Sequence, residues 1–167
     1  MILVTSFLCV LLIQAPGSQQ PEPSRSRPAS NQTGRLSPVS DASVLVTLEN
    51  GEAYLIKGEM SRALQEFRKV IQIDPKSSLA HYRIATIYFG RENYDLALND
   101  YRDALAGDSQ PPWVDAWSHI QLGKIFDLRG QRERAVCEYR LAIQAGEPAY
   151  GAIDQAQKLL DHPFQQP

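Results

Sequence analysis

The stretch HIQLGKIFDLRGQRERAVCEYRLAI, from His119 to Ile143, repeats an earlier part of the chain. Thirty-eight residues upstream, His81 to Leu105 reads HYRIATIYFGRENYDLALNDYRDAL, with the same residue at seven positions. A third copy, TLENGEAYLIKGEMSRALQEFRKVI, runs from Thr47 to Ile71, 34 residues before the second. Apolar residues recur at helical spacing through all three copies. Repetition at this period predicts an array of similar helical units.

Each copy predicts two helices that share one packing pattern. In the first helix a small residue stands three positions before an aromatic one, and in the second an alanine stands four positions before an aromatic one. Small residues let two helix axes approach to about 8 Å, and aromatic rings fill the space beside them. The pairs are Gly51 and Tyr54, Ala85 and Tyr88, and Gly123 and Phe126 in the first helices, and Ala63 and Phe67, Ala97 and Tyr101, and Ala135 and Tyr139 in the second.

The longer second interval comes from four extra residues in the segment SQPPWVD, residues 109–115. Four residues make about one helical turn. We therefore expect them to lengthen the next helix at its start, with Pro111 or Pro112 in the first turn, where a missing N–H is harmless.

This pattern resembles the tetratricopeptide repeat family over about residues 44 to 147. The resemblance implies an all-α fold, an α-solenoid of three helix-turn-helix repeats. The sequence departs from the family where a large aromatic residue often opens the first helix, because Thr47, His81 and His119 stand there. The proline that closes a repeat is present at Pro75, replaced by Ser109, and shifted by one to Pro148.

The expected organisation has five parts. They are an apolar segment at 1–17, a disordered Pro/Ser-rich linker at 18–40, the repeats at 41–147 (about 44–77, 78–111 and 116–147), a capping helix at 148–162 and a tail at 163–167. A capping helix protects the end of such an array from solvent.

The N-terminal segment MILVTSFLCVLLI carries no charge and is too short to span a bilayer. With the small residues Ala15 and Gly17 after it, the segment matches a secretory signal peptide, although basic residues before the apolar run are missing. We expect an exported protein, periplasmic or extracellular, with this segment as the one candidate for an envelope tether. A cytoplasmic protein is the alternative. Asn31 begins an NQT glycosylation sequon, which matters only in a eukaryotic secretory pathway.

No motif in the chain predicts catalysis, a cofactor or a metal. His81 and His119 hold equivalent places in adjacent repeats, too far apart to share one metal ion, and no carboxylate partner is evident beside both. We expect them at a half-buried seam. Cys137 aligns with the polar residues Gln65 and Asn99, so we expect an exposed free thiol there. The acid and arginine that flank Phe67, Tyr101 and Tyr139 are expected to form weak pairs on the outer face.

In a solenoid of this family the first helices line the concave surface, and members commonly hold an extended peptide or a helix there. The net charge of −2 provides no footprint for nucleic acid, so we expect a protein or peptide partner. Lys, Asn and Arg residues that clamp the C-terminal carboxylate of heat-shock chaperones are absent, because Leu48, Glu52, Arg83, Trp117 and Gln121 hold those positions. The residues expected on the concave face are Leu48, Glu52, Leu55, Tyr82, Thr86, Phe89, Trp117, Gln121 and Lys124.

The sequence therefore predicts a non-catalytic protein-interaction scaffold, similar to short exported bacterial members of the family. Two alternatives stay open. The first is a structural module that associates weakly with itself by stacking its repeat ends, and the second is a fragment of a larger repeat protein.

Overall fold

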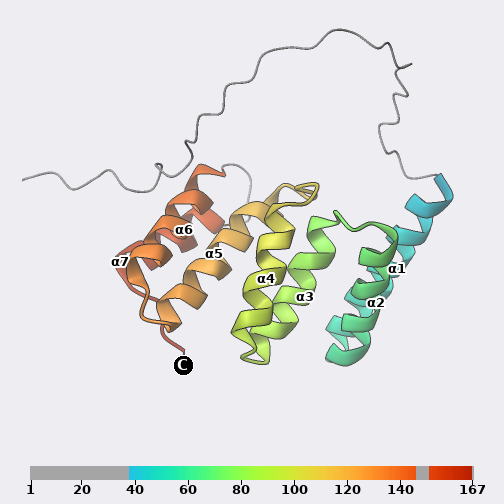
Figure 1. Ribbon diagram of the computed structural model, residues 1–167, viewed down its shortest axis with the longest axis horizontal. Coiled ribbons are helices and arrows are strands. Elements are labelled where there is room, and N and C mark those ends of the chain that lie inside the picture. The colour runs from blue at the N-terminus through green and yellow to red at the C-terminus, as the bar shows by residue number, and fades with distance from the viewer. Residues whose placement is uncertain (1–37, 146–150, 167) are drawn as a thin grey trace, which may run out of the picture. The chain divides into compact units, whose positions relative to one another are not determined.

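The computed structural model describes residues 38–145 and 151–166 of the chain, which form α-helices and contain no strand (Figure 1). The all-α prediction is confirmed. The apolar segment 1–17, residues 18–37 of the expected linker and the Asn31 sequon lie outside the described residues. The helices are α1 (Pro38–Ile56), α2 (Met60–Ile73), α3 (Ser78–Gly90), α4 (Tyr94–Leu105), α5 (Trp113–Leu128), α6 (Arg132–Gln144) and α7 (Ala152–Asp161).

The helices pack as three successive hairpins. Helix α1 pairs with α2, α3 with α4, and α5 with α6, and each hairpin also packs on the next through the α2–α3 and α4–α5 contacts. Helix α7 packs on α6 and α5 at the end of this row (Figure 1). The arrangement is the predicted helical-repeat solenoid with a helix at its C-terminal end. In the described part of the chain, no helix is both long and apolar enough to cross a membrane.

Small residues bring the two helices of each hairpin together, as their spacing predicts. A Cβ atom added to Gly51 would lie 2.6 Å from Cε1 of the fully buried Phe67, and one added to Gly123 would collide with the ring of Tyr139. Ala85 holds the equivalent place in the second hairpin and is fully buried. Hence, in the first and third hairpins, the bare backbone of the first helix is the surface on which the aromatic ring rests.

The core divides at helix α3. On one side, Ala80, Ile84 and Ile87 pack in a cluster with the apolar face of α2. On the other side, Tyr82 and Ala85 belong to a second cluster that runs through α4, α5 and α6 to α7. Helix α3 is therefore covered on two opposite sides, which explains why its sequence is apolar almost throughout.

The four extra residues lengthen helix α5 at its start. The repeat equivalent of Ser78, the first residue of α3, is Ala116, yet α5 begins at Trp113. Pro112 precedes the first helical residue and already has helical dihedral angles. The insertion thus adds nearly one turn to a first helix, and this turn carries Trp113.

The turns between paired helices use one backbone conformation at equivalent positions. Gly58 and Gly130 have φ values of 74° and 68°, and Glu92 in the middle repeat has a φ of 59°. A left-handed conformation costs a non-glycine residue about 1–2 kcal/mol. Gly90, the glycine of the middle turn sequence, instead ends helix α3.

Two element bounds differ from the intervals expected from sequence. Helix α1 begins at Pro38, so residues 38–40, expected at the end of the linker, are helical. The helix expected at 148–162 spans Ala152–Asp161, and Gly151 precedes it with a φ of 79°. Glycine tolerates this conformation without steric cost.

Replacing Gly123 by alanine tests the close approach of α5 and α6. The added methyl group would force the buried ring of Tyr139 to move, so we expect the variant to lose about 1–3 kcal/mol of unfolding free energy. Urea denaturation followed by circular dichroism measures this loss. Gly90→Ala is the matched control, because nothing lies within 4 Å of its added Cβ. The control should keep its stability or gain up to about 1 kcal/mol. Equal losses in both variants would contradict the packing explanation.

Candidate functional site: the face of the first helices

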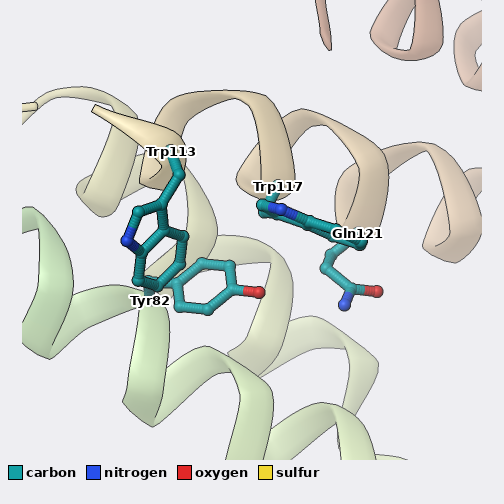
Figure 2. A pocket seen from close by; sticks show the side chains of 4 residues that line it. All are labelled: Tyr82, Trp113, Trp117 and Gln121. Atoms are coloured by element: carbon teal, nitrogen blue, oxygen red, sulfur yellow. The ribbon is translucent and has the colours of Figure 1, made fainter. Parts of the chain in front are cut away.

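The first helices α3 and α5 form an open pocket of about 510 Å³ (Figure 2). Its lining residues are Tyr82 from α3 and Trp113, Trp117 and Gln121 from α5, spaced one turn apart along that helix. The rings of Tyr82 and Trp113 meet edge to face, with centroids 5.2 Å apart. Figure 2 shows the Tyr82 hydroxyl directed toward the carboxamide of Gln121.

Two polar groups lie at the pocket, the Tyr82 hydroxyl and the Gln121 carboxamide. Burial raises the pKa of the Tyr82 hydroxyl, so this group stays protonated at neutral pH and can donate a hydrogen bond. Oε1 of Gln121 is buried and has no hydrogen-bond partner among the described residues. A buried carbonyl oxygen without a partner costs free energy, and a donor supplied by a ligand would recover it. The pocket therefore combines an aromatic wall with a buried acceptor that has no partner in the part of the chain that the structure describes.

The guanidinium group of Arg83 packs against the rings of Tyr82 and Trp113. Its guanidinium carbon lies 5.5 Å from the centroid of the Trp113 ring and 5.8 Å from that of Tyr82. Its Nε donates to Oε1 of Glu52, on α1, at 2.5 Å. Arg83 therefore already provides the cation for these two rings and neutralises Glu52. An apolar or aromatic group is a better match for the rest of the pocket than a second cation.

The other predicted residues lie outside the pocket lining. Leu48 and Leu55 are half-buried against the cluster of α2 and α3. The hydroxyl of Thr86 donates to the carbonyl of Tyr82 and lies 3.3 Å from the Tyr101 hydroxyl.

Phe89 and Lys124 lie farther along α3 and α5, and both contact Phe164 of the C-terminal segment. Of the nine predicted residues, three line the pocket, Tyr82, Trp117 and Gln121, and the other six lie outside its lining.

Comparisons with known proteins point to one family. A tetratricopeptide repeat model matches residues 51–77. The type IV pilus assembly protein PilF of Pseudomonas aeruginosa is 36% identical over 63 residues, which cover 38% of this chain and 25% of PilF. The chain therefore spans about a quarter of the length of that relative.

Solved structures of repeat proteins have the same fold. The TPR domain of P58(IPK) aligns with a TM-score of 0.63 and 23% identity, over 71% of this chain and 32% of that one. The first TPR of Spaghetti (RPAP3), solved with the HSP90 peptide SRMEEVD, aligns with a TM-score of 0.59 and 19% identity, over 72% and 92%. The described helices thus have the fold of tetratricopeptide repeat proteins, and residues 51–77 match the model of that repeat.

The repeat register explains which site residues were missed. Adding 38 to Tyr82 and Phe89 gives Ile120 and Asp127, whereas Trp117 and Gln121 correspond to Leu79 and Arg83. The residues predicted for the third tetratricopeptide repeat are therefore not all equivalents of those in the first two. Trp113, absent from the prediction, stands four residues before Trp117, and this spacing puts both on one helical face. That spacing could have identified Trp113 from sequence.

Each histidine of the repeats pairs with a carboxylate on the second helix of its own hairpin. Nδ1 of His119 lies 2.8 Å from Oε2 of Glu138, and Nδ1 of His81 lies 3.4 Å from Oδ1 of Asp100. The expectation that no carboxylate recurs beside both histidines is wrong, because each acid stands 19 residues after its histidine. These two acids, expected to pair with neighbouring arginines, face the first helix instead.

His81 also belongs to a group with Asp100 and Asp103, whose ligand atoms lie within 4.8 Å of one another. Nε2 of His81 lies 3.2 Å from the Pro75 carbonyl oxygen, so both ring nitrogens already contact protein oxygens. Hydrogen bonding within the repeat therefore accounts for the position of the His81 ring.

Cys137 differs from its repeat equivalents. Gln65 and Asn99 are exposed, whereas Cys137 is half-buried and is not a free thiol in the structure. The expectation of an exposed free thiol is wrong, because alignment with polar residues does not report how far neighbouring atoms cover this position.

The His81–Asp100 contact predicts a pH-dependent contribution to stability. The hydrogen bond to Asp100 raises the pKa of His81 above its ordinary value of 6.5 despite an opposing effect of burial. The folded state therefore binds the proton more tightly than the unfolded state. The resulting stabilisation is fully present below pH 6.5 and is lost as the pH rises through the folded-state pKa.

We expect His81→Gln to lose more unfolding free energy at pH 5.5 than at pH 8, and NMR titration to give His81 a pKa above 6.5. Asp100→Asn is the matched control, since it removes the principal cause and should bring the pKa of His81 down. A wild-type value at or below 6.5 would contradict the proposed pairing.

Proposed function

We propose that the chain is a non-catalytic scaffold that binds an extended peptide or a helix of a protein partner on the face of its first helices. The open pocket between α3 and α5 carries this proposal. Its three aromatic side chains are suited to one apolar anchor. The Gln121 carboxamide, whose Oε1 has no hydrogen-bond partner within residues 38–145 and 151–166, is suited to a neighbouring hydrogen-bond donor.

The residue types of the pocket favour recognition of protein. Tryptophan and tyrosine are enriched among the residues that contribute most to binding energy at protein interfaces. Trp113 and Trp117 are only half-buried, so they retain surface that a partner can cover.

The chemistry of the face also limits the partner. Among neighbours of the same fold, the first TPR of RPAP3 was solved bound to an HSP90 peptide, so the fold can hold a peptide. Clamping a C-terminal carboxylate needs free cationic groups, and here Arg83 is already engaged by Glu52 and by the rings of Tyr82 and Trp113. We therefore propose an internal segment with an apolar or aromatic side chain as the partner.

Self-assembly through repeat ends is the second candidate. Leu45 and Val46 on α1 are 61% and 57% exposed. Among the described helices, α1 makes its main packing contacts with α2 alone. Association through this end would give a mass that rises with protein concentration in light scattering. A constant monomer mass would exclude it.

Trp117→Ala tests the pocket directly. Truncation of a central interface tryptophan typically costs more than 2 kcal/mol, so we expect at least about a tenfold loss of partner recovery in a quantitative pull-down from the native source. Circular dichroism should show unchanged helicity.

Leu141→Ala is the matched control for this pull-down. Leu141 is a large apolar residue, 42% exposed, on the second helix α6, away from the pocket lining. Its replacement should leave recovery unchanged. Full recovery with Trp117→Ala, or an equal loss with both variants, would refute binding at the pocket.

A further inference from the structure

The C-terminal segment, residues 162–166, links the third repeat to the second. Helix α7 ends at Asp161, and His162 has extended dihedral angles. The backbone N–H of Phe164 donates to Oδ2 of Asp127, on α5, at 2.8 Å. Gln166 then reaches the α3–α4 turn, where its Nε2 donates to Oε1 of Glu92 at 3.0 Å and its Oε1 accepts from the Tyr94 hydroxyl at 3.0 Å. Figure 1 shows this end of the chain near the C-terminal end of α5.

The side chain of Phe164 occupies a small site between α3 and α5. Its ring centroid lies 6.3 Å from that of Phe89, and Nζ of Lys124 lies 5.2 Å from it. Burial lowers the pKa of Lys124, and among the described residues no carboxylate forms an ion pair with it. Phe89 and Lys124 are thus two face residues covered by the chain itself.

Asp127 is held ready to accept a backbone N–H. Its carboxylate, only 1% exposed, accepts from Nη1 of Arg132 at 3.0 Å and from the Tyr139 hydroxyl at 2.8 Å. These contacts come from α6 and do not depend on the C-terminal segment. Any extended segment offers backbone N–H groups, so a segment that also carries an aromatic ring can bind at this site in the same way.

The site lies next to the pocket. Trp117 and Lys124 are seven residues apart on α5, a distance of about 10.5 Å along the helix axis. An extended chain covers this distance in about three residues. A partner segment anchored in the pocket and continuing along α5 would therefore reach the place that Phe164 occupies.

The contacts of the C-terminal segment are those of a displaceable ligand. They comprise one half-buried ring, one hydrogen bond to a buried carboxylate and two hydrogen bonds at the exposed Gln166. Because the segment is joined to α7 by few residues, its effective concentration at the site is in the millimolar range. Weak contacts therefore suffice to keep it bound until a competitor arrives.

We propose that Phe89, Lys124 and Asp127 form a second subsite, which receives an aromatic side chain of an extended partner segment, and that residues 163–166 occupy it as an intramolecular competitor. This proposal rests on the proposed function of the face. It identifies the partner segment as one with an aromatic residue near its pocket anchor. It also makes partner binding conditional on release of the C-terminal segment.

A synthetic peptide of residues 161–166, DHPFQQ, tests the subsite without knowledge of the partner. The peptide is titrated to millimolar concentration into full-length wild type and Phe164→Ala, and ¹H–¹⁵N NMR follows the amides of Phe89, Lys124 and Asp127. We expect these amides to shift in Phe164→Ala and the wild type to bind about tenfold more weakly, because its own segment competes. A peptide with alanine in place of phenylalanine is the matched control and should shift neither protein.

Equal binding to both proteins, or no binding to Phe164→Ala, would overturn the proposal. If Phe164→Ala loses its fold, a chain ending at His162 replaces it with the same expected results. A wild-type dimer that exchanges C-terminal segments is a third outcome. It would appear as a mass that falls on the Phe164→Ala substitution, and it would also contradict an intramolecular competitor.

The failures of the two proposals can be told apart. The peptide titration does not require Trp117 or the partner, so peptide binding with an insensitive pull-down refutes only the pocket. Loss of partner with Trp117→Ala, but no peptide binding, refutes only the second subsite. If both proposals hold, Phe164→Ala should recover more partner than the wild type in the same pull-down.

Discussion

The contact between a small residue on each first helix and an aromatic ring on its second helix is the constraint on which the structure depends. At Gly51 and Gly123 no room exists for even one added carbon, because the rings of Phe67 and Tyr139 lie against the backbone. Both rings are fully buried. The contact sets the distance between the two helices of the hairpin. Because it uses one face of the first helix, it also determines which face of that helix stays open to other contacts. Tyr82 and Trp117 line the pocket from helices whose small residues are already used in this way.

The remaining face of the first helices has two parts. One part is the open pocket, and the other is covered by the C-terminal segment of the chain itself. Near the starts of α3 and α5, three aromatic residues and Gln121 surround an open pocket. Nearer the ends of the same helices, Phe164 covers Phe89 and Lys124. Asp127 joins the two functions of that region, since one carboxylate anchors the Arg132 side chain beside α7 and holds the returning backbone. Stability of the capping helix and occupation of the face are therefore coupled through one buried charge.

Much of the fold follows from the sequence because packing repeats with the chain. The sequence alone reveals the spacing between each small residue (Gly51, Ala85 and Gly123) and its aromatic partner. It also reveals the one-turn insertion before α5. Contacts between residues that are not at equivalent repeat positions produce no periodic pattern in the sequence. Phe164 contacts Phe89, which lies 75 positions earlier in the sequence, and no pattern in HPFQQP predicts this contact. The histidine–carboxylate pairs were missed for a different reason, since flanking residues suggested another partner for Asp100 and Glu138.

The lengthened start of α5 has a consequence for how such a face can diversify. An α-helix advances 100° per residue, so four added residues return the helix to within about 40° of its original orientation. Gly123 and Phe126 consequently keep their buried places while Trp113 is added at the open end. Whole-turn insertions between repeats thus supply new recognition side chains without disturbing the core. An array built from near-identical hairpins can acquire selectivity at the point where its spacing is irregular.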